Sequence, residues 1–157
     1  TEFPLFEYNT EEQRWDSKHN PFTSPLNPDD IFKVKDPLSL KSRAYDLVLN
    51  GVEIAGGSIR IHKPEVQKKV FSILKISPEE MEKQFGFFLE ALKYGTPPHG
   101  GIAFGMERFV STLLNIESIR DVIAFPKTTS ALCQMTGAPD DITQEQLNEL
   151  NLEVKND

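Results

Sequence analysis

The clearest pattern of hydrophobic and polar positions lies in the middle of the chain. Residues 44–49 alternate as in a β-strand, and a second strand-like run over residues 52–61 follows Asn50-Gly51. Asn-Gly is the strongest short signal of a hairpin turn, because both turn positions need a positive φ. The pattern therefore predicts a β-hairpin with a two-residue loop.

Two amphipathic helices are predicted after the hairpin. The first spans residues 64–74, and its apolar stripe consists of Val66, Val70, Ile73 and Leu74. The second begins at Ser77-Pro78-Glu79-Glu80, a capping box with proline at the first helical position, and ends at Gly95. The side chains expected to face inward from it are Met81, Phe85, Phe88, Leu89 and Leu92.

The remaining segments complete a mixed pattern. Residues 102–105 are expected to form a short buried strand that leads into a helix over residues 106–114. Residues 119–125 are expected to be extended or mixed, and a capping-box pattern at Thr143 predicts a short helix. Residues 9–43 show little periodicity, which is typical of a functional or partner-covered loop. A hairpin without repeated βαβ units favours an α+β fold with an antiparallel sheet flanked by helices.

Composition narrows the class of protein. The 157 residues have the length of one domain, and they carry a net charge of −7. This acidic balance argues against a generic nucleic-acid coat but leaves room for an enzyme whose basic surface lies elsewhere. The only cysteine, Cys133, excludes a disulfide framework, and no apolar run is long enough to cross a membrane. We expect a cytoplasmic or organelle-matrix protein, and the start at Thr1 without methionine leads us to expect a piece of a longer one.

The predicted hairpin brings two carboxylates together. A two-residue loop pairs Val48 with Glu53 and Asp46 with Ala55, so Asp46 and Glu53 share a face and lie diagonally across the ladder. Two such carboxylates repel each other unless a cation lies between them. Mg²⁺, held by both carboxylates and by the phosphates of a substrate, would suit this arrangement.

Arg60 extends the same charged face only if the strand is irregular. It lies seven positions after Glu53, which in a regular strand places it on the opposite face. We predict a β-bulge at Gly56-Gly57, because one extra residue would return Arg60 to the carboxylate face. The alternative is a solvated sheet face that carries only a salt-bridge cluster.

A second candidate site is the turn between strand and helix from Gly101 to Arg108. Its glycines would let the backbone approach a ligand closely, and a helix N-terminus favours anions. Arg108 in the first helical turn opposes the helix dipole, which favours an external anion. The turn is neither a Walker loop nor a dinucleotide fingerprint, and the alternative is a packing turn with a surface arginine.

Of the three histidines, His19 is the candidate for ligand binding, because it lies in a proline-rich loop. His62 and His99 are expected to be structural. The spacing of histidines and cysteine argues against a zinc-type metal site.

Four segments, taken together, resemble the C-terminal part of the catalytic domain of bacterial-type or mitochondrial aspartyl-tRNA synthetases, which are class II aminoacyl-tRNA synthetases. Residues 101–108, GIAFGMER, resemble motif 3 of the class. Three further segments resemble the aspartyl branch of this class, namely AYDLVLNGVEIAGGSIRIH from Ala44, HNPFTSP from His19 and IRDVIAFPKTTSALCQMTGAPD from Ile119. The similarity covers nearly the whole chain.

The resemblance implies an aspartate site and an ATP site. Arg60 would bind the side-chain carboxylate of aspartate and His19 would close over the amino acid, whereas Asn20 stands where many relatives have a second histidine. Arg108 would bind the ATP phosphates and Glu53 would hold Mg²⁺, which makes these two the implied catalytic residues. The further residues implied are Asp46 beside Mg²⁺, and Gly105, Met106 and Glu107 along the nucleotide.

The implied reaction converts aspartate and ATP into aspartyl-adenylate and pyrophosphate, and then transfers the aspartyl group to tRNA(Asp). The full-length family enzyme would be a homodimer. Motifs 1 and 2 and the anticodon-binding barrel have no match here, so we expect residues 1–157 to be a single partial domain, inactive alone, with an exposed sheet edge. Two alternatives are an aspartate-activating amide ligase on the same core and a non-catalytic synthetase-like binding or regulatory module.

Overall fold

The predicted hairpin is the centre of a three-stranded antiparallel sheet. In the computed structural model, which describes residues 1–155, Asn50-Gly51 joins β3 (Ala44–Leu49) to β4 (Val52–Ile59), and β5 (Gly100–Phe104) pairs with the other side of β4. Asn50 and Gly51 have φ angles of 51° and 80°. Both turn residues therefore have the positive φ that a two-residue hairpin loop requires.

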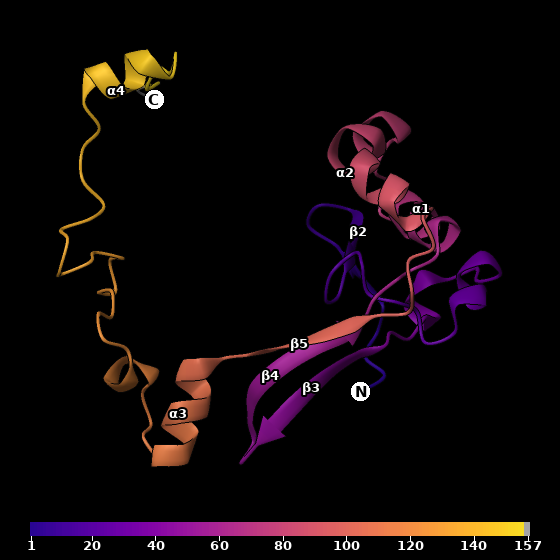
Figure 1. The fold of residues 1–157 in the computed structure, drawn as a ribbon, viewed down its shortest axis with the longest axis horizontal. Coiled ribbons are helices and arrows are strands. Elements are labelled where there is room, and N and C mark those ends of the chain that lie inside the picture. Colours follow the sequence, from indigo (N-terminus) through magenta and orange to yellow (C-terminus); the bar gives the residue numbers. More distant parts are fainter. Residues whose placement is uncertain (156–157) are drawn as a thin grey trace.

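Helices lie beyond both ends of this sheet (Figure 1). α1 (Pro64–Ile73) and α2 (Pro78–Leu92) lie between β4 and β5 in the chain and pack against each other, whereas α3 (Met106–Leu114) follows β5 at the opposite end. The α+β class with antiparallel strands is thus confirmed. Of the single domain predicted over residues 1–157, residues 156 and 157 lie outside the described part.

The hairpin contains a β-bulge, but not where the glycines predict it. Val48 pairs with Glu53 and Leu47 with Ala55, so Ile54 is the extra residue. Because the extra residue lies after Glu53, each side chain beyond it lies on the opposite face from the one it would have in a regular strand.

The predicted bulge at Gly56-Gly57 is therefore wrong, and Asp46 pairs with Gly56 instead of Ala55. Both glycines stay in the regular ladder, and neighbours pass close to Gly57: a Cβ on it would lie 1.9 Å from the carbonyl oxygen of Gly101. Arg60 nevertheless lies on the predicted face, because a single extra residue between Glu53 and Arg60 returns its side chain to the face of Asp46.

β5 is an exposed edge strand, which corrects the prediction of a buried one. All of its residues are exposed, and Ile102 and Phe104 remain 48% and 53% accessible. Within residues 1–155 no strand pairs with its outer edge. Its apolar side chains look like those of a buried strand, but burial depends on what covers the strand and not on the strand's own sequence.

The N-terminal segment is more ordered than its sequence predicts. β1 (Phe6–Asn9) pairs with β2 (Arg14–Ser17), and two 3₁₀ helices follow, η1 (Pro28–Phe32) and η2 (Pro37–Ser39). The turn of the hairpin depends on Asn9, whose side-chain oxygen accepts the backbone N–H groups of residues 11 and 12 at 3.0 Å each. Such a local device leaves no periodic trace in the sequence.

α1 contributes to two hydrophobic clusters. The first consists of Leu5, Phe6, Ile31, Leu40, Ile61, Val66 and Val70. The second consists of Phe71, Leu89 and Leu92, against which Phe22, Ile76, Met81, Phe85 and Phe88 pack. The side chains predicted to face inward from both helices lie in or against these clusters, and the capping box of Ser77 and Glu80 is present.

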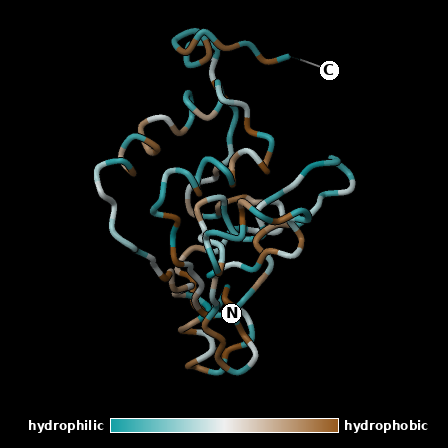
Figure 2. The backbone as a smooth tube through the Cα atoms, turned by 90° about the vertical axis from the view of Figure 1, so that its right-hand side faces the viewer, coloured by the Kyte–Doolittle hydropathy of each residue, from teal (hydrophilic) through white to brown (hydrophobic). Residues whose placement is uncertain are grey.

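The segment after α3 runs away from the sheet (Figure 1). Residues 119–125 begin with a 3₁₀ helix, η3 (Ile119–Val122), and the predicted capping box at Thr143 starts α4 (Gln144–Glu149). Figure 2 shows hydrophobic and hydrophilic positions mixed along this segment. No helix within residues 1–155 is both long and apolar enough to span a bilayer.

Candidate active site

Asp46 and Glu53 share one face of the sheet, as predicted. A Cβ built on Gly56 would lie 3.1 Å from Glu53 Oε1 and 3.2 Å from Asp46 Oδ1, so both exposed side chains lean over the same glycine. The two carboxylates thus border an open cradle that any larger side chain would fill. Oxygen donors of this kind suit Mg²⁺, which takes its remaining ligands from water and phosphate. Within residues 1–155 no group of three or more His, Cys, Asp or Glu side chains forms a metal site.

Arg108 lies next to this cradle. Its Nη1 donates to the backbone oxygen of Glu53 at 3.2 Å and lies 4.0 Å from Glu53 Oε2. Both side chains are about half exposed, so the pair is screened by water and the guanidinium keeps donors free for a ligand.

The N-terminus of α3 faces the same region. The amide of Gly105 donates to the Ile54 carbonyl oxygen at 2.9 Å and so fastens the turn to the bulge of β4. No side chain caps the helix, which leaves its first amides available to an anion. A hollow of about 390 Å³ lies here, lined by Glu53, Ile54, Ala55, Gly56, Ala103, Gly105, Glu107, Arg108, Ile119 and Ile123. Met106 is not among these residues and is 62% exposed.

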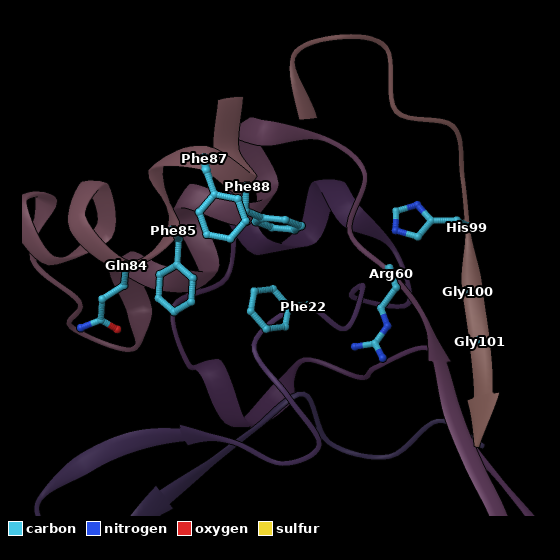
Figure 3. Close-up of a pocket in the computed structure, with 9 residues that line it drawn as sticks. All are labelled: Phe22, Arg60, Gln84, Phe85, Phe87, Phe88, His99, Gly100 and Gly101. Atoms are coloured by element: carbon cyan, nitrogen blue, oxygen red, sulfur yellow. The ribbon is translucent and has the colours of Figure 1, made fainter. Parts of the chain in front are cut away.

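Arg60 lines a second and larger hollow of about 600 Å³ (Figure 3). Its Nη1 donates to Asn20 Oδ1 at 2.7 Å, and its backbone amide donates to the carbonyl oxygen of His99 at 2.9 Å. Opposite lies an aromatic wall, and the other lining residues are Phe22, Gln84, Phe85, Phe87, Phe88, His99, Gly100 and Gly101.

His19 reaches Arg60 only through Asn20. The Nδ2 of Asn20 lies 2.6 Å from His19 Nδ1, and the imidazole itself is exposed and does not line the hollow. The loop histidine and the arginine, both predicted as ligand-binding residues, are thus linked by a side chain between them.

The two hollows follow each other along one face of the sheet. Gly56 pairs with Ala103 at the first hollow, and Ser58 pairs with Gly101 at the second. Because Arg60 follows Ser58 by two positions, its side chain lies on the face of Gly56. Within the described residues Arg60 forms no ion pair with the carboxylates, and the ion pair on this face joins Glu53 to Arg108.

Sequence reasoning missed three features of the site. The sequence marks Asn20 only as a departure from the usual histidine, although Asn-Pro-x-Thr is a typical turn sequence. Phe85 and Phe88 pack against the core as predicted, but they also line the hollow together with Phe87, which is 81% exposed. His99, predicted to be structural, holds Arg60 through its backbone and also lines the hollow with its ring (Figure 3).

The family described as "tRNA synthetases class II (D, K and N)" matches residues 1–129. An aspartate–tRNA(Asp/Asn) ligase of Dictyoglomus turgidum is 54% identical over 154 residues, which are 98% of this chain and 26% of the relative. An aspartate–tRNA ligase of Thermosipho melanesiensis is 55% identical over 153 residues, again 98% of this chain and 26% of the relative. The chain thus spans about a quarter of the length of these curated relatives.

Solved structures give the same fold. The aspartyl-tRNA synthetase of Entamoeba histolytica matches 74% of this chain and 21% of its own, with a TM-score of 0.57 and 29% identity. The asparaginyl-tRNA synthetase of Pyrococcus horikoshii matches 70% of this chain and 24% of its own, with a TM-score of 0.54 and 28% identity.

Proposed function

The chain belongs to the class II tRNA synthetases of the D, K and N group, and from this premise we propose that it carries the aspartate site and part of the ATP site of an aspartate–tRNA ligase. The observation that carries the proposal is the single sheet face on which Arg60 lines one hollow while Glu53 and Arg108 line the next. One hollow would receive the amino acid and the other the nucleotide.

Arg60 is proposed to bind the side-chain carboxylate of aspartate. A guanidinium offers five donors in a planar fork, and one of them is used by Asn20. The remaining donors can hold a carboxylate from two sides, and the amide of asparagine would supply no charge to match. His19 is proposed to close over the bound amino acid from the loop.

Arg108, Glu53 and Asp46 are proposed to act on the triphosphate of ATP. Arg108 would neutralise phosphate oxygens, and the open amides at the start of α3 would add donors. The two carboxylates above Gly56 are the residues that would hold Mg²⁺, which when bound would spread the phosphate charge. Gly105 and Glu107 line the same hollow and would contact the nucleotide. Met106 does not line the hollow, and it is proposed to contact only the part of the nucleotide that extends beyond it.

The chemistry needs no protein nucleophile. The α-carboxylate of aspartate attacks the α-phosphorus of ATP, the bond to the β-phosphate oxygen breaks, and pyrophosphate leaves. A terminal hydroxyl of tRNA(Asp) then attacks the carbonyl of the aspartyl-adenylate, and AMP leaves. The contribution of this chain is to hold the two reactants in line and to stabilise charge on the phosphates.

The complete reaction is proposed to require sequence beyond these 157 residues, in keeping with the quarter of the relatives' length that they span. tRNA(Asp) binding and a homodimeric state are likewise proposed for the whole natural protein. An amide ligase on the same core would activate aspartate without charging tRNA. A tRNA-charging assay on the whole natural protein therefore distinguishes an aspartate–tRNA ligase from an amide ligase.

Replacing Arg60 by lysine tests the proposal. In aspartate-dependent ATP–pyrophosphate exchange by the whole natural protein, Arg60→Lys is expected to raise KM for aspartate roughly tenfold to a hundredfold, because the forked charge-assisted contact is lost. The matched control is Arg43→Lys, since Arg43 is exposed and lines neither hollow.

Arg108→Lys is expected to show the opposite pattern to Arg60→Lys: a raised KM for ATP and a nearly unchanged KM for aspartate. If Arg60→Lys leaves KM for aspartate at the level of the Arg43→Lys control, the assignment of the amino-acid site is wrong.

A further inference from the structure

We propose that Asn20 is a positioning residue that sets both the direction of the Arg60 guanidinium and the tautomer of His19, and thereby fits the site to a carboxylate ligand. The identity of the ligand as aspartate rests on the proposed function, whereas the effect on His19 does not.

The side chain of Asn20 lies at the centre of a small hydrogen-bond network. Its Oδ1 accepts from Arg60 Nη1 at 2.7 Å, from the backbone amide of Phe22 at 3.0 Å and from Thr23 Oγ1 at 3.2 Å. Its Nδ2 lies 2.6 Å from His19 Nδ1. No other side chain within residues 1–155 contacts both proposed aspartate-binding residues.

The orientation of the amide follows from its neighbours. A guanidinium and a backbone N–H can only donate, so the oxygen of Asn20 must face Arg60 and Phe22. The NH₂ group then faces His19, and because it can only donate, His19 Nδ1 must accept at this 2.6 Å contact. His19 Nδ1 also lies 3.2 Å from Thr23 Oγ1, but that hydroxyl is the longer contact and can rotate to suit either tautomer. The ring proton of neutral His19 is therefore on Nε2.

The loop that carries Asn20 is held on several sides. The Pro21 carbonyl oxygen accepts from Gln67 Nε2 of α1 at 2.7 Å, and Gln67 is fully buried. The ring of Phe22 packs edge-on against Phe71, Phe85 and Phe88, at centroid distances of 6.2, 5.9 and 5.3 Å. Thr23 Oγ1 bonds to Ser58 Oγ of β4 at 3.0 Å. Asn20 therefore presents its amide from a fixed frame.

A neutral acceptor is what a carboxylate-binding arginine needs beside it. Asn20 holds one guanidinium N–H and leaves the positive charge of Arg60 uncompensated, so the charge remains available to the ligand. An aspartate at the same position would hold the same N–H, but its charge would compete with a ligand carboxylate for Arg60.

Asn20→Asp separates positioning from folding. Aspartate can accept the Phe22 and Thr23 bonds and so preserves the turn, but it cannot donate to His19. Asn9→Asp is the matched control, because Asn9 also accepts two loop amides and lies at the turn between β1 and β2, outside both hollows. Asn20→Ser is the second variant, since its shorter side chain can cap the turn without reaching Arg60.

The first measurement is the ¹⁵N spectrum of the His19 ring in the unliganded natural protein labelled with ¹⁵N-histidine, with the signal assigned by its loss in His19→Gln. We expect a protonated Nε2 and a bare Nδ1 in the parent and in Asn9→Asp, and a protonated Nδ1 in Asn20→Asp. A protonated Nδ1 in the parent, or an unchanged tautomer in Asn20→Asp, would overturn the proposal.

The second measurement is the Kd for aspartate and for asparagine, by titration calorimetry on the same proteins. Asn20→Asp is expected to weaken aspartate binding about tenfold or more and to leave asparagine binding within about twofold, with a smaller loss in Asn20→Ser. An unchanged Kd for aspartate in both variants overturns the role toward Arg60. A parent protein with the expected tautomer but without affinity for aspartate overturns the proposed function instead, and it supports the effect of Asn20 on His19.

Discussion

At the scale of single residues, the site depends on two adjacent glycines that serve different contacts. Gly56 leaves room for the carboxylates of Asp46 and Glu53, whereas Gly57 lies under the ring of Tyr45. The hydroxyl of Tyr45 donates to the carbonyl oxygen of Gly101 at 2.9 Å and so ties β3 to β5 across β4. A Cβ on Gly57 would lie 2.9 Å from this ring and 1.9 Å from the Gly101 oxygen.

Gly57→Ala is therefore expected to lower the free energy of unfolding by about 3 kcal/mol or more, because backbone and ring must both shift. Urea unfolding followed by circular dichroism measures it. Gly101→Ala is the control, since a Cβ there meets nothing within 4 Å and should change stability by less than about 1 kcal/mol. Equal stability of the two variants would contradict this role of Gly57.

The residues of the candidate site could be grouped from the sequence, but their local geometry could not be predicted in full. Asp46 and Glu53 share a face as predicted, because alternation and a two-residue loop are local rules. Arg60 joins that face only through one extra residue, whose position the sequence does not predict. The bulge lies at Ile54 and not at the glycines, because Gly105 from the far end of β5 bonds to the Ile54 carbonyl. A contact between residues 51 positions apart leaves no mark in the strand itself.

At the scale of elements, α2 starts with a reciprocal capping box that includes a titrating group. The backbone N–H of Ser77 donates to Glu80 Oε2 at 3.0 Å, and this bond, followed by the one between the side chains, lowers the pKa of Glu80. Because folding lowers the pKa, the stabilisation is present above the ordinary glutamate pKa of about 4.3 and is lost as the pH falls through the lower folded-state value.

Acidification from pH 5 to pH 3 should thus weaken the start of α2 less in Glu80→Gln than in the parent, since glutamine can form the same box without titrating. The measurement is the midpoint of thermal unfolding at each pH. Glu79→Gln serves as the control because Glu79 takes no part in the box. If Glu80→Gln and Glu79→Gln lose stability equally over this range, the capping carboxylate has no such role.

Elements with local signals could be predicted, and elements set by distant partners could not. The hairpin of β3 and β4 and the helices α1 to α4 follow turn residues, caps and periodicity. β1 and β2 have four residues each and depend on the Asn9 turn, so their pattern is too short to recognise. The exposure of β5 depends on its neighbours in space and is invisible in its own sequence.

At the scale of the whole molecule, apolar exposure is concentrated where the chain leaves the sheet. Along β5, α3 and the segment that follows, the exposed large apolar side chains include Phe104, Met106, Leu113, Leu114, Phe125 and Met135. Large apolar side chains left exposed in such number are typical of surface that contacts further protein. It agrees with a chain that spans about a quarter of the length of its curated relatives.

The family includes enzymes for aspartate, lysine and asparagine, as the letters of its description state, and the site must choose among these amino acids. A guanidinium at Arg60 would attract the carboxylate of aspartate, repel the ammonium of lysine and leave the amide of asparagine without a matching charge.

ATP–pyrophosphate exchange by the whole natural protein, measured with each of the three amino acids in turn, tests this selectivity. We expect exchange with L-aspartate and at most about 1% of that rate with L-asparagine or L-lysine at equal concentration, a discrimination of about 3 kcal/mol. Comparable exchange with asparagine or lysine, or none with aspartate, would contradict it.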